Sequence, residues 1–140
     1  MTFAPQPKPE KPLRLERHER RRAHSSKEDF VKREAKRRDG GQCRWPRCEY
    51  RKVVQPLDAA HIAAKGMGGT PDGRRNVREN LMAICRLHHQ GRCSLHSGDL
   101  AIEPLTAQGT DGPCAFYSTD PDGKRFMVAQ ETAIGLYARD

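Results

Sequence analysis

Hydrophobic residues are sparse in the first third of this chain and become regular only beyond it. The first twelve residues are rich in proline and lysine, which favours disorder, and the stretch LRLERHERRRAH that follows is dense in charge, compatible with a helix that contacts nucleic acid. Residues 25–41 carry both end signals of a helix. Ser26 with Asp29 matches a capping box, and Gly40 follows a basic last turn. Few residues in this segment are apolar, so we expect a weakly packed helix with an exposed basic face.

The remaining apolar runs are short and predict strands and one short helix. VVQPLDAAHI (53–62) is typical of an edge strand, because Pro56 cannot donate to a ladder. NLMAICRLHHQG (80–91) begins apolar and runs into a helix, and DLAIEPL (99–105) predicts a strand. AFYSTDPDGKRFMVAQE (115–131) predicts a hairpin that turns at Asp122-Gly123. The predicted fold is α+β, with a basic N-terminal helical extension (1–40), a central core (41–106) and a C-terminal β-hairpin extension (107–140).

Composition limits how the core can be stabilised. Of 140 residues, 35% are hydrophobic and 31% are charged. Such a chain builds a small apolar core, which a bound metal would help to hold together. No apolar run approaches the ~20 residues that span a bilayer, and the N-terminus lacks the apolar segment of a secretory signal. We therefore expect an intracellular protein without a membrane partner.

The positive charge is concentrated at the N-terminus. The whole chain carries a net charge of +8. Residues 1–40 hold 13 Lys and Arg against 7 Asp and Glu, which leaves +6 in this segment and +2 in the rest. A basic arm beside a nearly neutral domain favours a polyanionic partner, most often nucleic acid. The alternative is a solubilising tail.

Cysteines and histidines occur at the spacing of a metal site. The five cysteines are Cys43, Cys48, Cys85, Cys93 and Cys114. An odd number without an export signal favours thiol or metal roles over disulfides. Zn²⁺ prefers four Cys or His ligands in two short-spaced pairs. Cys43 with Cys48, and Cys85 with His88, are such pairs, and they predict a structural zinc site. The alternative is a set of buried thiols. Cys93 and Cys114 have no short-spaced partner and are expected to be ordinary surface or core thiols.

The order of these motifs resembles the HNH endonuclease family, whose core is the ββα-metal (His-Me) finger. The resemblance rests on Cys-x4-Cys, the AHI at 60–62, a Gly-rich loop, the NL at 80–81 and Cys-x-x-His-His, and it covers roughly residues 42–96. It implies that residues 41–106 form an HNH nuclease core. Such a core would hydrolyse DNA phosphodiester bonds with a catalytic divalent cation, for which Mg²⁺ or Mn²⁺ is expected. Small stand-alone members occur in phages, mobile elements and bacterial defence.

The resemblance also implies residue roles. His61 would be the general base that activates water, and Asn80 would hold the following loop and orient His61. His89 would bind the catalytic cation, which leaves its neighbour His88 to the zinc. Two bland alternatives stay open: His61 as a hydrogen-bonded core histidine, and Asn80 as a helix cap or turn residue.

Two positions depart from the family pattern. Many members carry Asp or His just before the base, where this chain has Ala60. Asp58 lies two residues earlier, on the same side of the strand, and would reach the cation only if the strand bends. A second histidine ligand often follows four residues after the position of His89, but His96 follows after seven. His96 would bind the same cation only if Gly91 ended the helix, because seven helical residues span ~10.5 Å.

Basic residues near these motifs predict contacts with DNA phosphates. The candidates are Lys65, Arg74, Arg75 and Arg78 between the base and Asn80, with Arg37 and Arg38 from the N-terminal arm. Such contacts supply affinity without sequence choice, and the alternative is a solvated loop. Two competing functions remain at this stage. One is a catalytically silent, zinc-stabilised nucleic-acid-binding module, which Ala60 favours. The other is a zinc-stabilised protein-interaction domain with an acidic partner.

Overall fold

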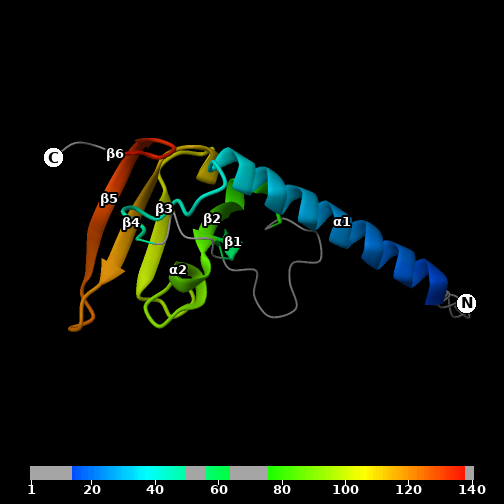
Figure 1. The fold of residues 1–140 in the computed structure, drawn as a ribbon, viewed down its shortest axis with the longest axis horizontal. Helices are drawn as coiled ribbons and strands as arrows, with labels where there is room; N and C mark the ends of the chain where they lie inside the picture. Colours follow the sequence, from blue (N-terminus) through cyan, green and yellow to red (C-terminus); the bar gives the residue numbers. More distant parts are fainter. Residues whose placement is uncertain (1–13, 50–55, 64–75, 138–140) are drawn as a thin grey trace, which may run out of the picture.

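One long helix and two antiparallel sheets make up the α+β fold in the computed structural model (Figure 1), which describes residues 14–49, 56–63 and 76–137. The elements, in chain order, are α1 (Arg14–Arg38), β1 (Leu57–His61), η1 (Arg78–Asn80), β2 (Leu81–Cys85), α2 (Arg86–Gln90), β3 (Leu100–Pro104), η2 (Gly109–Asp111), β4 (Cys114–Thr119), β5 (Arg125–Ala133) and β6 (Leu136–Tyr137). Within the described ranges, no helix has both the length and the apolar character needed to cross a bilayer.

Helix α1 is longer than the sequence predicted. The predicted helix start at Ser26 is wrong, because α1 begins at Arg14 and continues through Ser25 and Ser26 without interruption. Strong helix formers on either side outweigh the few tenths of a kcal/mol that an interior serine costs. The predicted end is confirmed. Gly40 and Gly41 adopt φ of 74° and 68°, and the Gly41 N–H donates to the Lys36 carbonyl at 2.8 Å.

Helix α1 projects away from the sheets and is attached by its C-terminal end (Figure 1). That end packs against β1, β2 and η1. Ala35 is the buried residue of α1, and most of its other side chains face solvent.

The first sheet pairs β1 with β2, and β2 leads directly into α2. The register sets Leu57 opposite Cys85 and His61 opposite Leu81. All five residues of β2 are buried, whereas in β1 only Ala60 is buried, and Asp58 and His61 are partly exposed. The result is a strand–strand–helix unit in which the ends of β1 and β2 present the residues singled out from the sequence.

The second sheet has the order β3-β4-β5-β6, antiparallel throughout. Its β4–β5 hairpin confirms the predicted C-terminal hairpin, with Gly123 at φ 82° in the turn. The predicted boundary at 106/107 falls between β3 and β4, which are neighbours in this sheet. The core lies between the two sheets, where Phe116 and Trp45 meet Met82 and Ile84.

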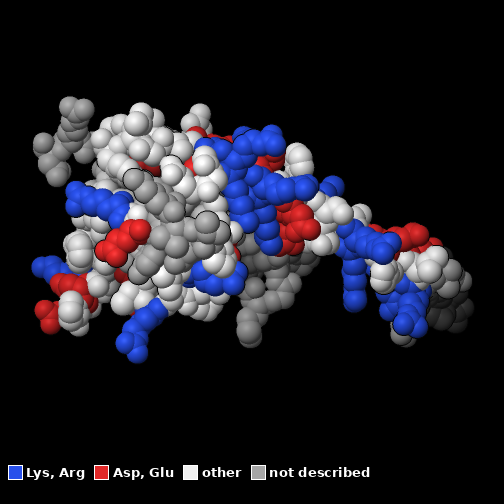
Figure 2. Space-filling view, in the orientation of Figure 1, with Lys and Arg blue, Asp and Glu red and all other residues white. Residues whose placement is uncertain are grey.

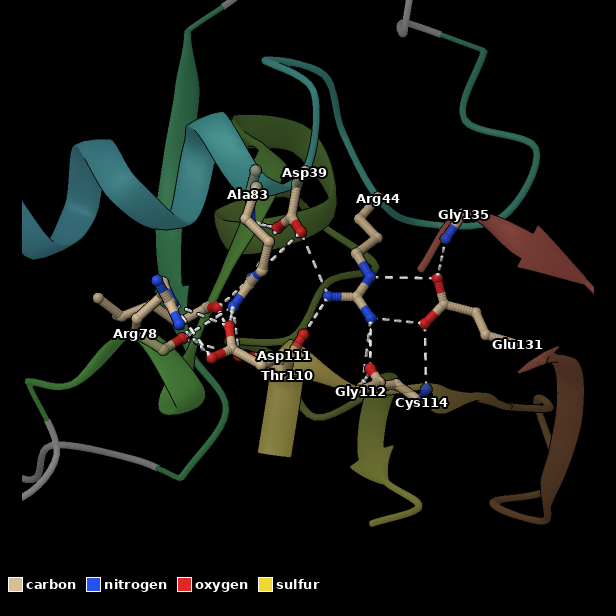
Figure 3. Close-up of polar contacts among 12 residues, drawn as sticks. Asp39, Arg44, Arg78, Ala83, Thr110, Asp111, Gly112, Cys114, Glu131 and Gly135 are labelled. Atoms are coloured by element: carbon tan, nitrogen blue, oxygen red, sulfur yellow. Dashed lines mark hydrogen bonds and ion pairs between the residues drawn. The ribbon is translucent and has the colours of Figure 1, made fainter. Parts of the chain in front are cut away.

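A buried ionic network joins the end of α1 to both sheets (Figure 3). Arg44, with 2% of its side chain exposed, grips Glu131 through Nε (3.1 Å) and Nη2 (2.7 Å). Its remaining N–H groups donate to Asp39 (3.3 Å) and to the carbonyls of Thr110 (2.6 Å) and Gly112 (2.8 Å). All five guanidinium N–H groups are thereby used, which is the condition for burying an arginine at tolerable cost.

Arg38 belongs to the same network, which corrects its predicted role as a phosphate contact. Its guanidinium donates to both oxygens of Asp39, to Asp111 and to the Leu81 carbonyl. Burial acts to lower the pKa of Arg38, but the hydrogen bonds to Asp39 and Asp111 outweigh it, and the pKa is raised. Because only 11% of this side chain is exposed, the charge serves the fold and does not face a ligand.

Candidate metal centre and catalytic histidines

Three cysteines and one histidine converge where the segment after α1 meets the start of α2. The ligand atoms of Cys43, Cys48, Cys85 and His88 all lie within 4.8 Å of one another. His88 Nδ1 is 3.2 Å from Cys85 Sγ and 3.7 Å from Cys43 Sγ, and the sulfurs of Cys48 and Cys85 are 3.9 Å apart. A tetrahedral site with metal–sulfur bonds of ~2.3 Å has edges of ~3.8 Å. This group could therefore hold a structural metal ion.

Backbone hydrogen bonds and aromatic packing fix these ligands. The Arg44 N–H donates to the Ala83 carbonyl at 2.9 Å, which docks the first cysteine pair onto β2. Arg47 adopts φ 54°, a left-handed conformation that closes the turn between the two cysteines. Trp45 packs against the His88 ring at 5.7 Å and edge-on against Phe116 at 5.4 Å. The cluster is thus continuous with the core.

Burial favours the uncharged forms of Cys43 and His88 when no cation is bound. It raises the pKa of the Cys43 thiol to about 12 and lowers the pKa of His88. Thiolates bind metal, so uptake of an ion would release protons and reverse the preference at Cys43.

The side chains of His88 and His89 face different parts of the protein, because adjacent residues on a helix point about 100° apart. His89 Nδ1 lies 3.0 Å from Asp58 Oδ2, and the other oxygen of Asp58 accepts from Arg86 at 3.0 Å. Burial alone would raise the pKa of Asp58, but the hydrogen bonds from Arg86 and His89 outweigh it, and the pKa is lowered. Asp58 thus meets His89 directly, from the face of β1 on which α2 packs.

His61 and Asn80 lie at the open end of the β1–β2 pair. Asn80 holds the chain just after His61: its Oδ1 accepts from the Ala63 N–H at 2.8 Å, and its Nδ2 donates to the Ala63 carbonyl at 3.1 Å. The Ile62 N–H also donates to the Asn80 carbonyl at 2.9 Å. The side chain that contacts the His61 ring is Asn76, whose Oδ1 is 2.8 Å from Nε2.

The sequence reasoning missed both Asn76 and the Asp58–His89 contact. For Asn76, the available signal was a second asparagine four residues before Asn80. The Nδ2 atom of Asn76 is buried, and no other described residue offers it a hydrogen bond. Among the described residues, the Asn76 carboxamide is therefore hydrogen-bonded through its Oδ1 atom alone, to His61.

The chain turns back after α2. The helix ends at Gln90, the Gly91 N–H caps it by donating to Leu87, and the His96 N–H donates to the His89 carbonyl at 3.0 Å. The backbone of His96 therefore returns to His89, as its predicted role requires, while its side chain is exposed. In the described ranges, the Cys₃His group is the one cluster of three or more Cys, His, Asp or Glu side chains close enough to share an ion, and it includes neither His89 nor His96.

The predicted phosphate contacts have different surroundings. Arg37 is exposed and lies 3.6 Å from Glu34. Arg78 is 47% exposed and pairs with Asp111 through two nitrogens. Lys65, Arg74 and Arg75 lie outside the described residues. Of the two cysteines without a short-spaced partner, Cys93 is exposed and Cys114 is buried.

Comparison of this chain with family profiles, curated proteins and solved structures found no match in any of the three.

Proposed function

We propose that this chain is a divalent-metal-dependent endonuclease of the HNH type, which hydrolyses DNA phosphodiester bonds on a zinc-stapled ββα-metal core. The observation that carries the proposal is the division of labour between two adjacent histidines. His88 Nδ1 faces the cysteine sulfurs, whereas His89 Nδ1 faces Asp58. The short helix α2 thus contributes His88 to the structural metal site and His89 to the proposed catalytic site.

Zinc is the proposed structural ion because of the donor set. Three thiolates and one imidazole at tetrahedral spacing suit Zn²⁺, whereas Mg²⁺ and Ca²⁺ prefer oxygen ligands. The ion would join the segment after α1 to the end of β2, which supplements the small apolar core.

His61 is the proposed general base. A neutral imidazole is a competent base near pH 7. If Asn76 Oδ1 accepts from the Nε2–H of His61, Nδ1 keeps the lone pair that removes a proton from water. Asn80 holds the backbone at Ala63 and so fixes the strand end from which His61 projects. Asn76 and Asn80 act on the base as positioning residues, one on the ring and one on the backbone.

His89 is the proposed ligand of the catalytic cation. When its Nδ1–H donates to Asp58, Nε2 is left as the ligand atom, an arrangement typical of metal-binding histidines. A Mg²⁺ or Mn²⁺ ion held there would stabilise the charge that develops on the phosphate and the leaving oxygen.

The test is conversion of supercoiled plasmid to nicked or linear DNA by the zinc-loaded protein. With Mg²⁺ or Mn²⁺ we expect cleavage that EDTA stops, and we expect His61→Ala to lower the rate by about 100-fold or more, because general-base catalysis contributes ~10²–10⁴. His89→Ala should lose cleavage and keep its zinc, whereas His88→Ala should lose the zinc. His18→Ala, in the exposed part of α1, is the matched control. Equal cleavage by wild type and His61→Ala, or none with either cation, would refute the proposal.

A second candidate, a catalytically silent zinc-stabilised module that binds nucleic acid, is favoured by Ala60. This residue is fully buried in the core, at the position where many HNH proteins carry an acidic or histidine ligand. A catalytically silent module of this kind should bind DNA with an affinity that weakens steeply with salt and does not depend on His61. Retained binding by wild type with no cleavage would decide for it.

A further inference from the structure

The projecting part of α1 carries charge but little packing. Figure 2 shows Lys and Arg side chains distributed along the helix beyond the body of the protein. Residues 14–27 are exposed throughout. Ordering such a helix costs conformational entropy, and its exposed side chains gain little from burial. The segment therefore adds little to the stability of the fold.

Four of the five arginines of this segment share one side of the helix. At ~100° per residue, Arg14, Arg20 and Arg21 lie within about 60° of Arg17, and we call these four residues the basic stripe. Glu16 and Glu19 lie about 100° and 160° away from Arg17. Within the described part of the chain no ion pair involves a member of the stripe, whereas Lys32 pairs with Glu28 further along the helix at 3.1 Å.

The stripe lies on the side of α1 that packs against the body. Arg17 and Ala35 are 18 residues apart, which is five turns of ~3.6 residues, so both point in the same direction. Ala35 is buried where α1 meets β1, β2 and η1. A ligand along the stripe would therefore continue toward the elements that carry His61 and Asn80.

We propose that the basic stripe is a phosphate-contact surface for duplex DNA, outside the catalytic site and on the same side of the molecule. This inference rests on the proposed function for the identity of the polyanion. Arginines on successive turns offer guanidinium groups every ~5–6 Å along a straight edge, which suits a regular row of phosphates. The predicted Arg37 is not part of this surface, because it lies about 160° from Arg17.

The test is DNA binding by fluorescence anisotropy, in a His61→Ala background so that no cleavage intervenes. The stripe variant, Arg14→Gln/Arg17→Gln/Arg21→Gln, removes three of the four stripe charges. The matched control, Arg22→Gln/Arg33→Gln/Lys124→Gln, removes the same charge from exposed positions outside the stripe: two on the same helix, about 140–160° from Arg17, and one in the turn between β4 and β5. Circular dichroism and zinc content check that both variants keep the fold.

The slope of log K against log[salt] is negative, and we expect its magnitude to be about 2.7 smaller in the stripe variant and little changed in the control, as each phosphate contact contributes ~0.9. Between 50 and 200 mM salt, wild type should then lose about 40-fold more affinity than the stripe variant. Equal changes in the two variants would show an effect of net charge alone and overturn the inference, as would no change in either. Binding of polyglutamate with the same dependence on the stripe would also overturn the assignment to a duplex.

The two proposals fail separately. Plasmid cleavage by wild type with an unchanged salt slope in the stripe variant would leave the nuclease proposal standing and remove this one. A stripe-dependent slope without cleavage would do the reverse.

Discussion

Replacing Arg44 with methionine should destabilise the protein strongly although Arg44 touches no proposed ligand. The substitution keeps an apolar stem and removes a guanidinium that satisfies Glu131, Asp39 and two backbone carbonyls. Glu131 is 2% exposed and, among the residues that the structure describes, would retain only the N–H groups of Cys114 and Gly135 as donors. Removing one partner of a buried ion pair costs ~3–5 kcal/mol, a large part of the ~5–15 kcal/mol that stabilises a typical domain.

Arg78→Met is the matched comparison. Arg78 also holds a carboxylate through two nitrogens, with the shortest contact to Asp111 at 2.8 Å. Its side chain is 47% exposed, and Asp111 would keep its hydrogen bond from Arg38. Exposed ion pairs contribute little, so we expect a loss of stability several times smaller than that of Arg44→Met.

Urea unfolding at a fixed free Zn²⁺ concentration measures both effects. Trp45 is the sole tryptophan, it is buried, and it packs against His88 and Phe116, so its fluorescence reports on the cluster and the core together. The zinc content of each variant shows whether Cys43, next to Arg44, still binds the ion. A loss below ~1 kcal/mol for Arg44→Met, or equal losses for the two variants, would refute the reasoning that burial determines the strength of these pairs.

Two further predictions concern the cysteines. We expect one Zn²⁺ per chain, and Cys85→Ser should weaken zinc affinity by at least ~100-fold, because losing even a residue that only orients a metal ligand costs ~10–100-fold. Cys93→Ser, at an exposed thiol, should leave zinc content unchanged. Equal zinc content in the two variants would contradict the cluster. Burial raises the pKa of Cys114 to about 11, so its thiol stays protonated at pH 8. With zinc bound, iodoacetamide should therefore modify Cys93 first, and peptide mapping that finds Cys114 alkylated equally fast would contradict its burial.

The features that the sequence predicted correctly are local in the chain. Cys85 and His88 are three residues apart and Cys43 and Cys48 are five apart, and such short-spaced pairs are typical of structural metal sites. The hairpin turn depends on Gly123, which adopts a φ of 82°. The exception among local signals is Ser26, where a capping pattern lies within a helix because its neighbours favour helix on both sides.

Contacts between distant residues left no such trace. Arg44 and Glu131 are 87 positions apart, and Arg38 and Asp111 are 73 apart. A lone arginine in a basic segment looks the same whether it will face a phosphate or a buried carboxylate, so Arg38 was assigned to the wrong partner. Asp58 and His89 meet 31 positions apart, because the pairing of β1 with β2 sets where α2 lies.

Helix α1 is mechanically a lever, held at one end. Its anchor is the junction at Arg38 and Asp39, and Asp39 in turn binds Arg44 and the Ala83 N–H inside the protein. The free end at Arg14 is ~36 Å from Arg38 along the axis, so a tilt of about 5° at the anchor moves it by ~3 Å. The stiffness of the buried network therefore sets how accurately the far end of the helix is aimed. A substitution at Arg44 would remove no charge from α1. It would still let the N-terminal end of the helix vary in position by ~3 Å, which is enough to break a direct contact with a phosphate.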